Sequence, residues 1–186
     1  KRLNRFIVVD FETTGSHPRQ GDSIIQIGAV AIDDGQITES YSTLINPGQP
    51  IPPFITQLTG ITDDMVADAP SLEEALPRFL RMLEGRAFVA HNAAFDLQFL
   101  QEALLSQGYY TFDGYVLDTV ELSRFLMPMQ NSYRLGELAD DLQIEHDRPH
   151  QADSDALATA RLFLHLLDIL CQLPLVTVQR LQIDRK

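Results

Sequence analysis

The chain has 186 residues, of which 45% are apolar, and its 26 acidic and 14 basic side chains give a net charge of −12. A chain of this length buries enough surface to fold as one domain without disulfides. A protein that binds nucleic acid mainly by charge is normally basic, so the composition argues against that class. A protein that meets nucleic acid at one small site through bound cations remains compatible with it.

The sequence carries no signal for a membrane or for secretion. No apolar run approaches the ~20 residues of a membrane span, and the first apolar run, residues 6–9, is too short for a signal peptide. The single cysteine, Cys171, excludes a disulfide framework, and its apolar surroundings predict a buried side chain. We therefore expect a cytoplasmic protein that has no membrane partner.

Three consecutive strands are predicted near the start of the chain. The β-branched apolar runs at 6–11 and 24–32 are typical of buried strands, and the alternation at 38–45 predicts a third. Asp33, Asp34 and Gly35 predict a hairpin turn between the last two. The prolines of residues 46–53 begin a loop.

Helices then alternate with two further strands. Ser71 and Glu74 form a capping box before a helix at 72–83, which Gly85 ends. Strands are predicted at 87–90 and 114–117, and helices at 93–105, 119–126, 135–142 and 153–170. This order predicts one α/β domain over residues 1–171 with a mixed sheet. Residues 172–186 form a tail or a linker toward a further domain.

Two carboxylates mark the end of the first strand. Asp10 and Glu12 stand at i and i+2, so their side chains share one face of the strand. Taken alone, they fit a strand end that simply reaches water. Thr13, Thr14 and Gly15 follow at once, and carboxylates beside hydroxyls and backbone N–H groups suit a divalent cation that holds a phosphate.

A second cluster, His-Asn-Ala-Ala-Phe-Asp, spans residues 91–96, where a predicted strand gives way to a helix. The structural interpretation is that Asn92 caps this helix and that Asp96 complements its dipole. That interpretation leaves Phe95 without an explanation.

The third cluster, His-Gln-Ala-Asp-Ser-Asp, spans residues 150–155 at the start of the longest helix. Asp153 is the better N-cap by position, and Asp155 then lies in the first turn. The structural interpretation is dipole complementarity for the acids and a surface position for His150.

Together the three clusters resemble the DEDDh group of DnaQ-like 3′→5′ exonucleases, which includes the proofreading exonucleases of bacterial replicative polymerases and exonuclease domains fused to helicases. The resemblance covers residues 6–170. It rests on V-V-D-F-E-T-T-G at 8–15, I-Q-I-G-A at 25–29, L-T-G-I-T at 58–62 and the clusters at 91–96 and 150–155. It implies a ribonuclease-H-like fold, with a five-stranded mixed sheet of antiparallel and then parallel strands flanked by helices.

The resemblance also implies the roles of the site residues. Asp10, Glu12, Asp96 and Asp155 would bind two divalent ions, Mg²⁺ with Mn²⁺ as a substitute, held ~3.5–4 Å apart. His150 would be the general base. The substrate-binding residues would be Thr13 and Thr14 at the 3′-hydroxyl, together with Leu58, Ile61, Asn92 and Phe95. For Leu58 and Ile61, ordinary core packing is an equally simple interpretation.

The implied function is metal-dependent removal of nucleoside 5′-monophosphates from single-stranded or frayed DNA 3′ ends, in proofreading or repair. Two alternatives stay open: an exoribonuclease acting on RNA 3′ ends, and a catalytically silent module of a polymerase or helicase assembly. The acidic balance indicates weak binding to long duplexes, so we expect a fused or associated polymerase or helicase partner.

Overall fold

The computed structural model describes residues 3–173 of the chain. Its strands are β1 (Arg5–Thr13), β2 (Ile24–Asp33), β3 (Gln36–Leu44), β4 (Ala87–Ala90) and β5 (Val116–Asp118). They form one sheet in the order β3-β2-β1-β4-β5. β1, β2 and β3 pair antiparallel, whereas β4 and β5 run parallel to β1. The predicted five-stranded mixed sheet is confirmed.

The hairpin between β2 and β3 turns where its sequence predicts. Asp34 and Gly35 both have positive φ, at 49° and 79°. Two-residue turns of this kind match the twist of the flanking strands, and glycine and aspartate tolerate them. β2 is buried along almost its whole length because it lies inside the sheet, while β3 forms an exposed edge.

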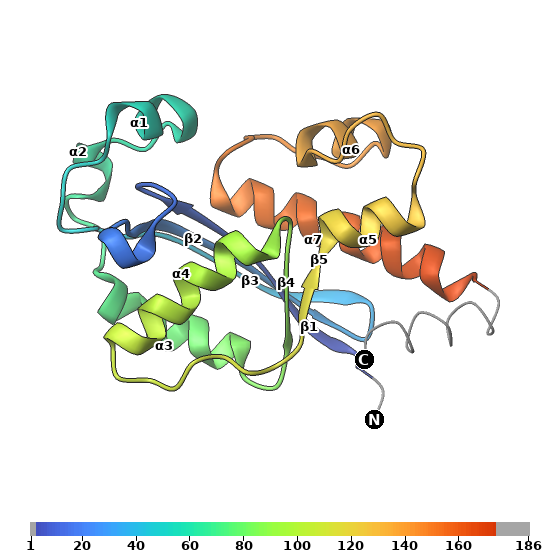
Figure 1. Cartoon of the computed structure of the whole chain (residues 1–186), viewed down its shortest axis with the longest axis horizontal. Helices are drawn as coiled ribbons and strands as arrows, with labels where there is room; N and C mark the ends of the chain where they lie inside the picture. Colours follow the sequence, from blue (N-terminus) through green and yellow to red (C-terminus); the bar gives the residue numbers. More distant parts are fainter. Residues whose placement is uncertain (1–2, 174–186) are drawn as a thin grey trace.

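The helices are η1 (Pro18–Gln20), α1 (Pro53–Thr59), α2 (Asp63–Val66), α3 (Leu72–Leu83), α4 (Ala93–Ser106), α5 (Thr119–Leu126), α6 (Leu135–Asp141) and α7 (Ala152–Cys171). Figure 1 shows α3 and α4 on one side of the sheet and α7, with α5 and α6 beside it, on the other. The short helices α1 and α2 lie near the carboxyl end of β1.

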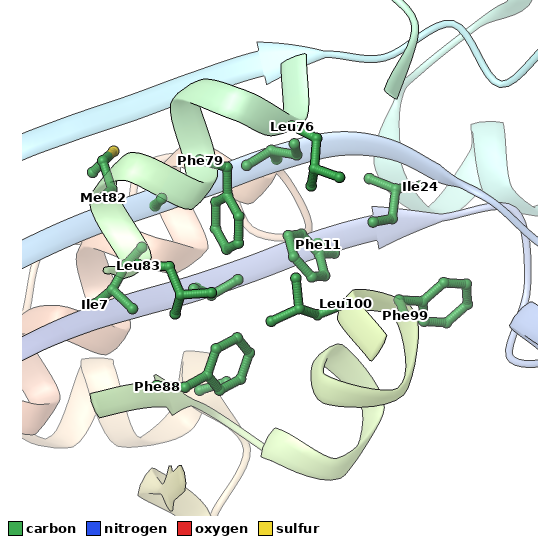
Figure 2. Close-up of a cluster of buried hydrophobic side chains, with 14 of the residues drawn as sticks. Ile7, Phe11, Ile24, Leu76, Phe79, Met82, Leu83, Phe88, Phe99 and Leu100 are labelled. Carbon is green, nitrogen blue, oxygen red and sulfur yellow. The ribbon is translucent and has the colours of Figure 1, made fainter. Parts of the chain in front are cut away.

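Each face of the sheet carries its own apolar core, because alternate residues of β1 point to opposite faces. Ile7 and Phe11 pack with α3 and α4 in the larger core, around Phe79 and Leu100 (Figure 2). Val8 faces the other way and packs against α7. The alternation that buries this strand therefore also decides which of its residues face α7.

Two predictions need correction, and two helices were not predicted. Residues 46–52 form the expected loop, but α1 and α2 follow it, because Pro53 opens a helix instead of preventing one. Gln151, not Asp153, is the N-cap residue of α7. Cys171, the last residue of α7, is exposed.

Two further expectations concern the ends of the domain and membranes. α7 ends at Cys171, and the predicted tail from residue 172 lies almost wholly outside the described residues, so that boundary stays a prediction. Within residues 3–173, no helix has the length and apolar character needed to cross a membrane.

Candidate active site

Asp10 and Glu12 lie on the face of β1 that α7 covers. Val8, two residues earlier on the same face, packs against α7. Beyond Val8 the apolar series gives way to the two carboxylates at the carboxyl end of the strand. In the antiparallel pairing, Asp10 lies opposite Gly28 of β2, and Glu12 lies opposite Gln26. The predicted convergence of the two side chains follows from this strand geometry.

Two further carboxylates reach the same end of the sheet from helices. Asp96, in the first turn of α4, is 3% exposed, and its Oδ1 accepts a hydrogen bond from the N–H of Phe11 at 2.8 Å. Asp155, in the first turn of α7, is 7% exposed. Carboxylate oxygens of Asp10, Glu12 and Asp155 lie within 4.8 Å of one another. Asp96 stands beside this group, bound to the backbone of β1.

The start of α7 is seated on β2. The buried side chain of Gln26 accepts a hydrogen bond from the N–H of Ala152 through Oε1, at 2.8 Å. A Cβ added to Gly28 would lie 2.4 Å from the carbonyl carbon of Ala152, so only glycine allows the helix to come this close. Because Asp155 is three residues further along α7, these contacts set its distance from the carboxylates of β1.

The start of α4 is held from β5. Asn92 occupies the N-cap position with φ at 67°, but its side chain makes no capping hydrogen bond. Instead, the carboxylate of Asp118 accepts hydrogen bonds from the N–H groups of Asn92 and Ala93, at 3.0 and 3.1 Å. Asn92 therefore stands at the predicted N-cap position, but the carboxylate of Asp118, not the side chain of Asn92, accepts the hydrogen bonds. Asp118 fixes the turn that carries Asp96.

Burial raises the pKa of all four carboxyls. The pKa of Glu12 and that of Asp96 each rise to about 8. Burial lifts the pKa of Asp10 well above its usual range, and the charges of the other three carboxylates add to the effect. The pKa of Asp155 is also raised, against the opposing effect of a neighbouring histidine.

Two observations indicate a cation site: the close approach of the carboxylates, and a buried oxygen of Asp10 that has no hydrogen-bond partner among the described residues. Oδ2 of Asp10 is buried and has no hydrogen-bond partner among residues 3–173. A buried acceptor without a donor is costly, and a divalent cation would satisfy it and offset the repulsion. The available ligand atoms are carboxylate oxygens, which suit Mg²⁺ or Mn²⁺. The donor set therefore fits the implied ions.

Two histidines approach Asp155, and only one was expected. His150 lies just before α7 with φ at 64°, and its N–H donates to Oδ1 of Asp155 at 3.3 Å, while its imidazole is exposed. The imidazole that reaches Asp155 belongs to His146. The structure thus places His150 beside the carboxylates, and its role as a base stays a prediction.

Thr13 and Thr14 are buried in the turn that follows β1. Thr13 donates its hydroxyl hydrogen to the carbonyl of Gly15 at 2.7 Å. Thr14 accepts the N–H of Ser23 at 2.9 Å and lies 3.4 Å from a carboxylate oxygen of Asp22. In this structure both hydroxyls therefore shape the turn. The hydroxyl oxygen of Thr13 still has lone pairs with which to accept a further hydrogen bond.

The remaining predicted substrate residues separate into exposed and buried ones. Leu58 on α1 is 51% exposed, whereas Ile61 is 2% exposed and packs among other isoleucines. The core-packing interpretation therefore describes Ile61. Phe95 is half-buried, with its ring centroid 5.2 Å from that of Phe99, and Asn92 is exposed. Leu58, Asn92 and Phe95 remain accessible to a substrate.

Four residues that shape the site had no predicted role: Gln26, Gly28, Asp118 and His146. A glutamine and a glycine inside an otherwise apolar buried strand are a signal of close backbone contact. Asp118 stands directly before a predicted helix, where an aspartate cap is common, but its bonds to the other helix could not be read from spacing. Only the recurrence of histidine four residues before His150 marks His146.

A family model described as "Exonuclease" matches residues 7–163 of the chain. Over 178 residues the chain is 49% identical to the "3'-5' exonuclease DinG" of Bacillus subtilis (strain 168), covering 96% of this chain and 19% of that protein. It is 42% identical over 176 residues to a "DNA polymerase III PolC-type" of Caldanaerobacter subterraneus subsp. tengcongensis, covering 95% and 12%. The chain thus spans a fifth or less of the length of these relatives.

Solved structures give the same result. The chain resembles "Exonuclease X in complex with 5' overhanging duplex DNA" at 29% identity with a TM-score of 0.67, covering 88% of this chain and 90% of that one. It also resembles the nuclease domain of "3'hExo, a DEDDh family member, bound to rAMP" at a TM-score of 0.78 and 18% identity, covering 94% and 96%. The second likeness is one of fold, and it confirms the predicted architecture.

Proposed function

Because the chain belongs to the Exonuclease family, we propose that it removes nucleoside 5′-monophosphates one at a time from the 3′ ends of single-stranded or frayed DNA. The observation that best supports this proposal is the cluster of buried and half-buried carboxylates, in which Oδ2 of Asp10 has no hydrogen-bond partner among the described residues. A silent module would gain nothing from such a cluster, since buried carboxylates that repel one another destabilise a fold.

Asp10, Glu12, Asp96 and Asp155 would hold two Mg²⁺ ions, with Mn²⁺ as a substitute. Bound cations of this kind stabilise the negative charge that develops on the attacking and leaving oxygens of a phosphodiester. The fold would hold the carboxylates in position before the ions bind. They lie on three separate elements, and the carboxylates of Asp96 and Asp155 each accept a hydrogen bond from a backbone N–H group. Little reorganisation is then needed when the substrate arrives.

His150 would accept the proton of the attacking water. Its backbone is tied to Asp155 through its N–H, whereas its imidazole is exposed at the edge of the carboxylate group. A neutral imidazole is a common general base in proteins.

The substrate would contact the accessible residues around the carboxylates. Phe95 offers a ring on which a terminal base stacks, an interaction worth about 1–3 kcal/mol per base in comparable proteins. Leu58 is exposed on α1, and Asn92 is exposed beside the start of α4. Thr13 would accept a hydrogen bond from the terminal 3′-hydroxyl. The names of the relatives favour DNA, and their greater length favours a polymerase or helicase partner for this domain.

The decisive experiment uses 5′-labelled DNA and RNA oligonucleotides of one sequence, incubated with Mg²⁺, with Mn²⁺ and with chelator. We expect metal-dependent shortening from the 3′ end that Asp10→Ala abolishes. Asp155→Asn should be inactive, whereas Asp168→Asn, an exposed aspartate on the same helix, should retain activity.

Each other outcome identifies an alternative. Faster shortening of the RNA would favour the exoribonuclease. Absence of shortening by the unaltered protein, with both metals, would favour the silent module.

A further inference from the structure

His146 reaches into the carboxylate cluster from the segment that joins α6 to α7. Its Nε2 lies 2.5 Å from Oδ1 of Asp155, and its side chain is 8% exposed. The ring lies beside the first turn of α6, where a Cβ added to Gly136 would be 4.0 Å from Nδ1. This imidazole is therefore enclosed by two helices and directed at one oxygen of Asp155.

The segment around His146 is fixed onto the start of α7. The N–H of Arg148 donates to Oγ of Ser154 at 3.0 Å, and the guanidinium of Arg148 pairs with Asp153. Two residues after His146, the chain is thus bonded to the same helical turn that carries Asp155. The contacts of Arg148 therefore hold the segment that carries the imidazole close to Asp155.

Both donors to Asp155 converge on the same atom. Oδ1 accepts from Nε2 of His146 and from the N–H of His150. Within residues 3–173, no hydrogen bond is formed to Oδ2, which is therefore the oxygen free to bind a cation. Fixing one oxygen of a carboxylate by two donors from different directions also fixes where the other oxygen points.

We propose that His146 is a positioning residue for Asp155: its imidazole orients the carboxylate so that the free oxygen faces Asp10 and Glu12, and thereby strengthens cation binding. The inference rests on the proposed function, because it concerns the same carboxylates. The two histidines then have different roles: His146 acts through Asp155, whereas the imidazole of His150 faces the solvent. Groups that orient a metal ligand typically contribute 10–100-fold in metal affinity or activity.

The test measures Mn²⁺ binding to the DNA-free protein by calorimetry, together with the Mn²⁺ concentration that gives half-maximal exonuclease activity. His146→Leu should weaken Mn²⁺ binding by about 10–100-fold and raise the half-maximal concentration equally, with a smaller change in kcat at saturating metal. His146→Gln, whose Nε2 reaches about as far as that of histidine, should recover most of the affinity. His165→Leu, a histidine further along α7, should bind as the unaltered protein does.

A second pair keeps the test decisive if His146→Leu fails to fold. Asparagine is polar but too short to place a donor where Nε2 lies, so His146→Asn should bind Mn²⁺ much more weakly than His146→Gln. Equal affinities of these two variants, or unaltered affinity of a folded His146→Leu, would overturn the inference. If the unaltered protein binds Mn²⁺ in a His146-dependent way but shortens no oligonucleotide, the proposed function fails and the positioning role stands.

Discussion

The backbone of Ala152, the first residue of α7, rests on Gly28, the residue that pairs with Asp10 across the β1–β2 ladder. A Cβ on Gly28 would lie 2.1 Å from the carbonyl oxygen of Ala152 and 3.0 Å from the nitrogen of Asp153. Both are backbone atoms of a long helix, which has no flexible side-chain end to move aside. The distance between helix and sheet at the active site therefore depends on the absence of one methyl group.

Gly28→Ala should displace the start of α7 and with it Asp155. Overpacking of this kind costs about 1–3 kcal/mol of unfolding free energy, and a displacement of ~1 Å at a catalytic site can cost about 10²-fold in activity. Urea unfolding and the oligonucleotide assay measure the two effects.

Gly136→Ala is the matched control, because a Cβ there would meet only Nδ1 of His146, at the ordinary contact distance of 4.0 Å. It should keep its activity and should not lose stability, since alanine favours a helix more than glycine does. If Gly28→Ala kept full activity, the close seating of α7 would not matter for catalysis.

The sequence predicts most of the architecture because its signals are local. The β-branched apolar run at 6–11 places β1 correctly. The capping box of Ser71 and Glu74 starts α3 where expected, with the Glu74 N–H bonded to the serine hydroxyl. Local signals do not predict which segments far apart in the sequence come into contact. α1 was missed because the prolines before it fit a loop as well as a helix start.

The same distinction applies to the active site. The spacing of Asp10 and Glu12 predicts their common face, but the docking of Asp155 against them depends on Gln26 and Gly28, more than a hundred residues away. Likewise, the sequence near α7 contains two histidines, His146 and His150, and residue type alone does not show which imidazole contacts Asp155. Only the folded chain shows that the imidazole of His146, and the backbone of His150, contact Asp155.

Neutralising one acid should stabilise the metal-free protein while it abolishes activity. Oδ2 of Asp10 is buried without a hydrogen-bond partner in residues 3–173, and the neighbouring carboxylates repel its charge, so Asp10→Asn removes an unfavourable charge. At pH 8, in chelator, we expect a gain on the order of 1–3 kcal/mol in unfolding free energy. Asp168→Asn, which changes an exposed charge, should alter stability little. A lower Tm for Asp10→Asn than for the unaltered protein would argue against repulsion within the cluster.

The carboxylate cluster should make the metal-free folded protein less stable as the pH rises. The pKa values of Glu12 and Asp96 are about 8 in the folded protein, above those of the unfolded chain. The folded state therefore binds these protons more tightly. The stabilisation they provide is complete below about pH 4 and is lost as the pH rises toward 8.

Divalent cations should reverse this loss, because they compete with the same protons for the carboxylates. The rise in Tm on adding Mn²⁺ should grow between pH 5.5 and 8.5, measured by differential scanning calorimetry against a chelator control. An increase that does not change with pH would show that the cation binds elsewhere.

Asp118 should matter for the site although it is not one of the four acids. Its carboxylate accepts the N–H groups of Asn92 and Ala93 and also that of Val120 at the start of α5. Asp118→Ala leaves all three donors without this acceptor and should cost about 1–2 kcal/mol of unfolding free energy. Asp118→Asn keeps one acceptor oxygen and should cost less. Hydrogen exchange should show the loss at residues 92 and 93, and an unchanged exchange rate there would contradict the capping role.

Leu58 and Ile61 provide a direct comparison between substrate contact and core packing. Leu58→Ala removes an exposed side chain, so unfolding free energy should change by no more than about 0.5 kcal/mol, while KM for the oligonucleotide rises several-fold. Ile61→Ala removes a buried side chain from the isoleucine cluster and should cost about 2–4 kcal/mol with little change in KM. Urea unfolding and steady-state kinetics on both variants separate the two roles. An unchanged KM in Leu58→Ala would remove Leu58 from the proposed substrate surface, whereas a raised KM in a folded Ile61→Ala would show that the isoleucine cluster positions α1 for binding.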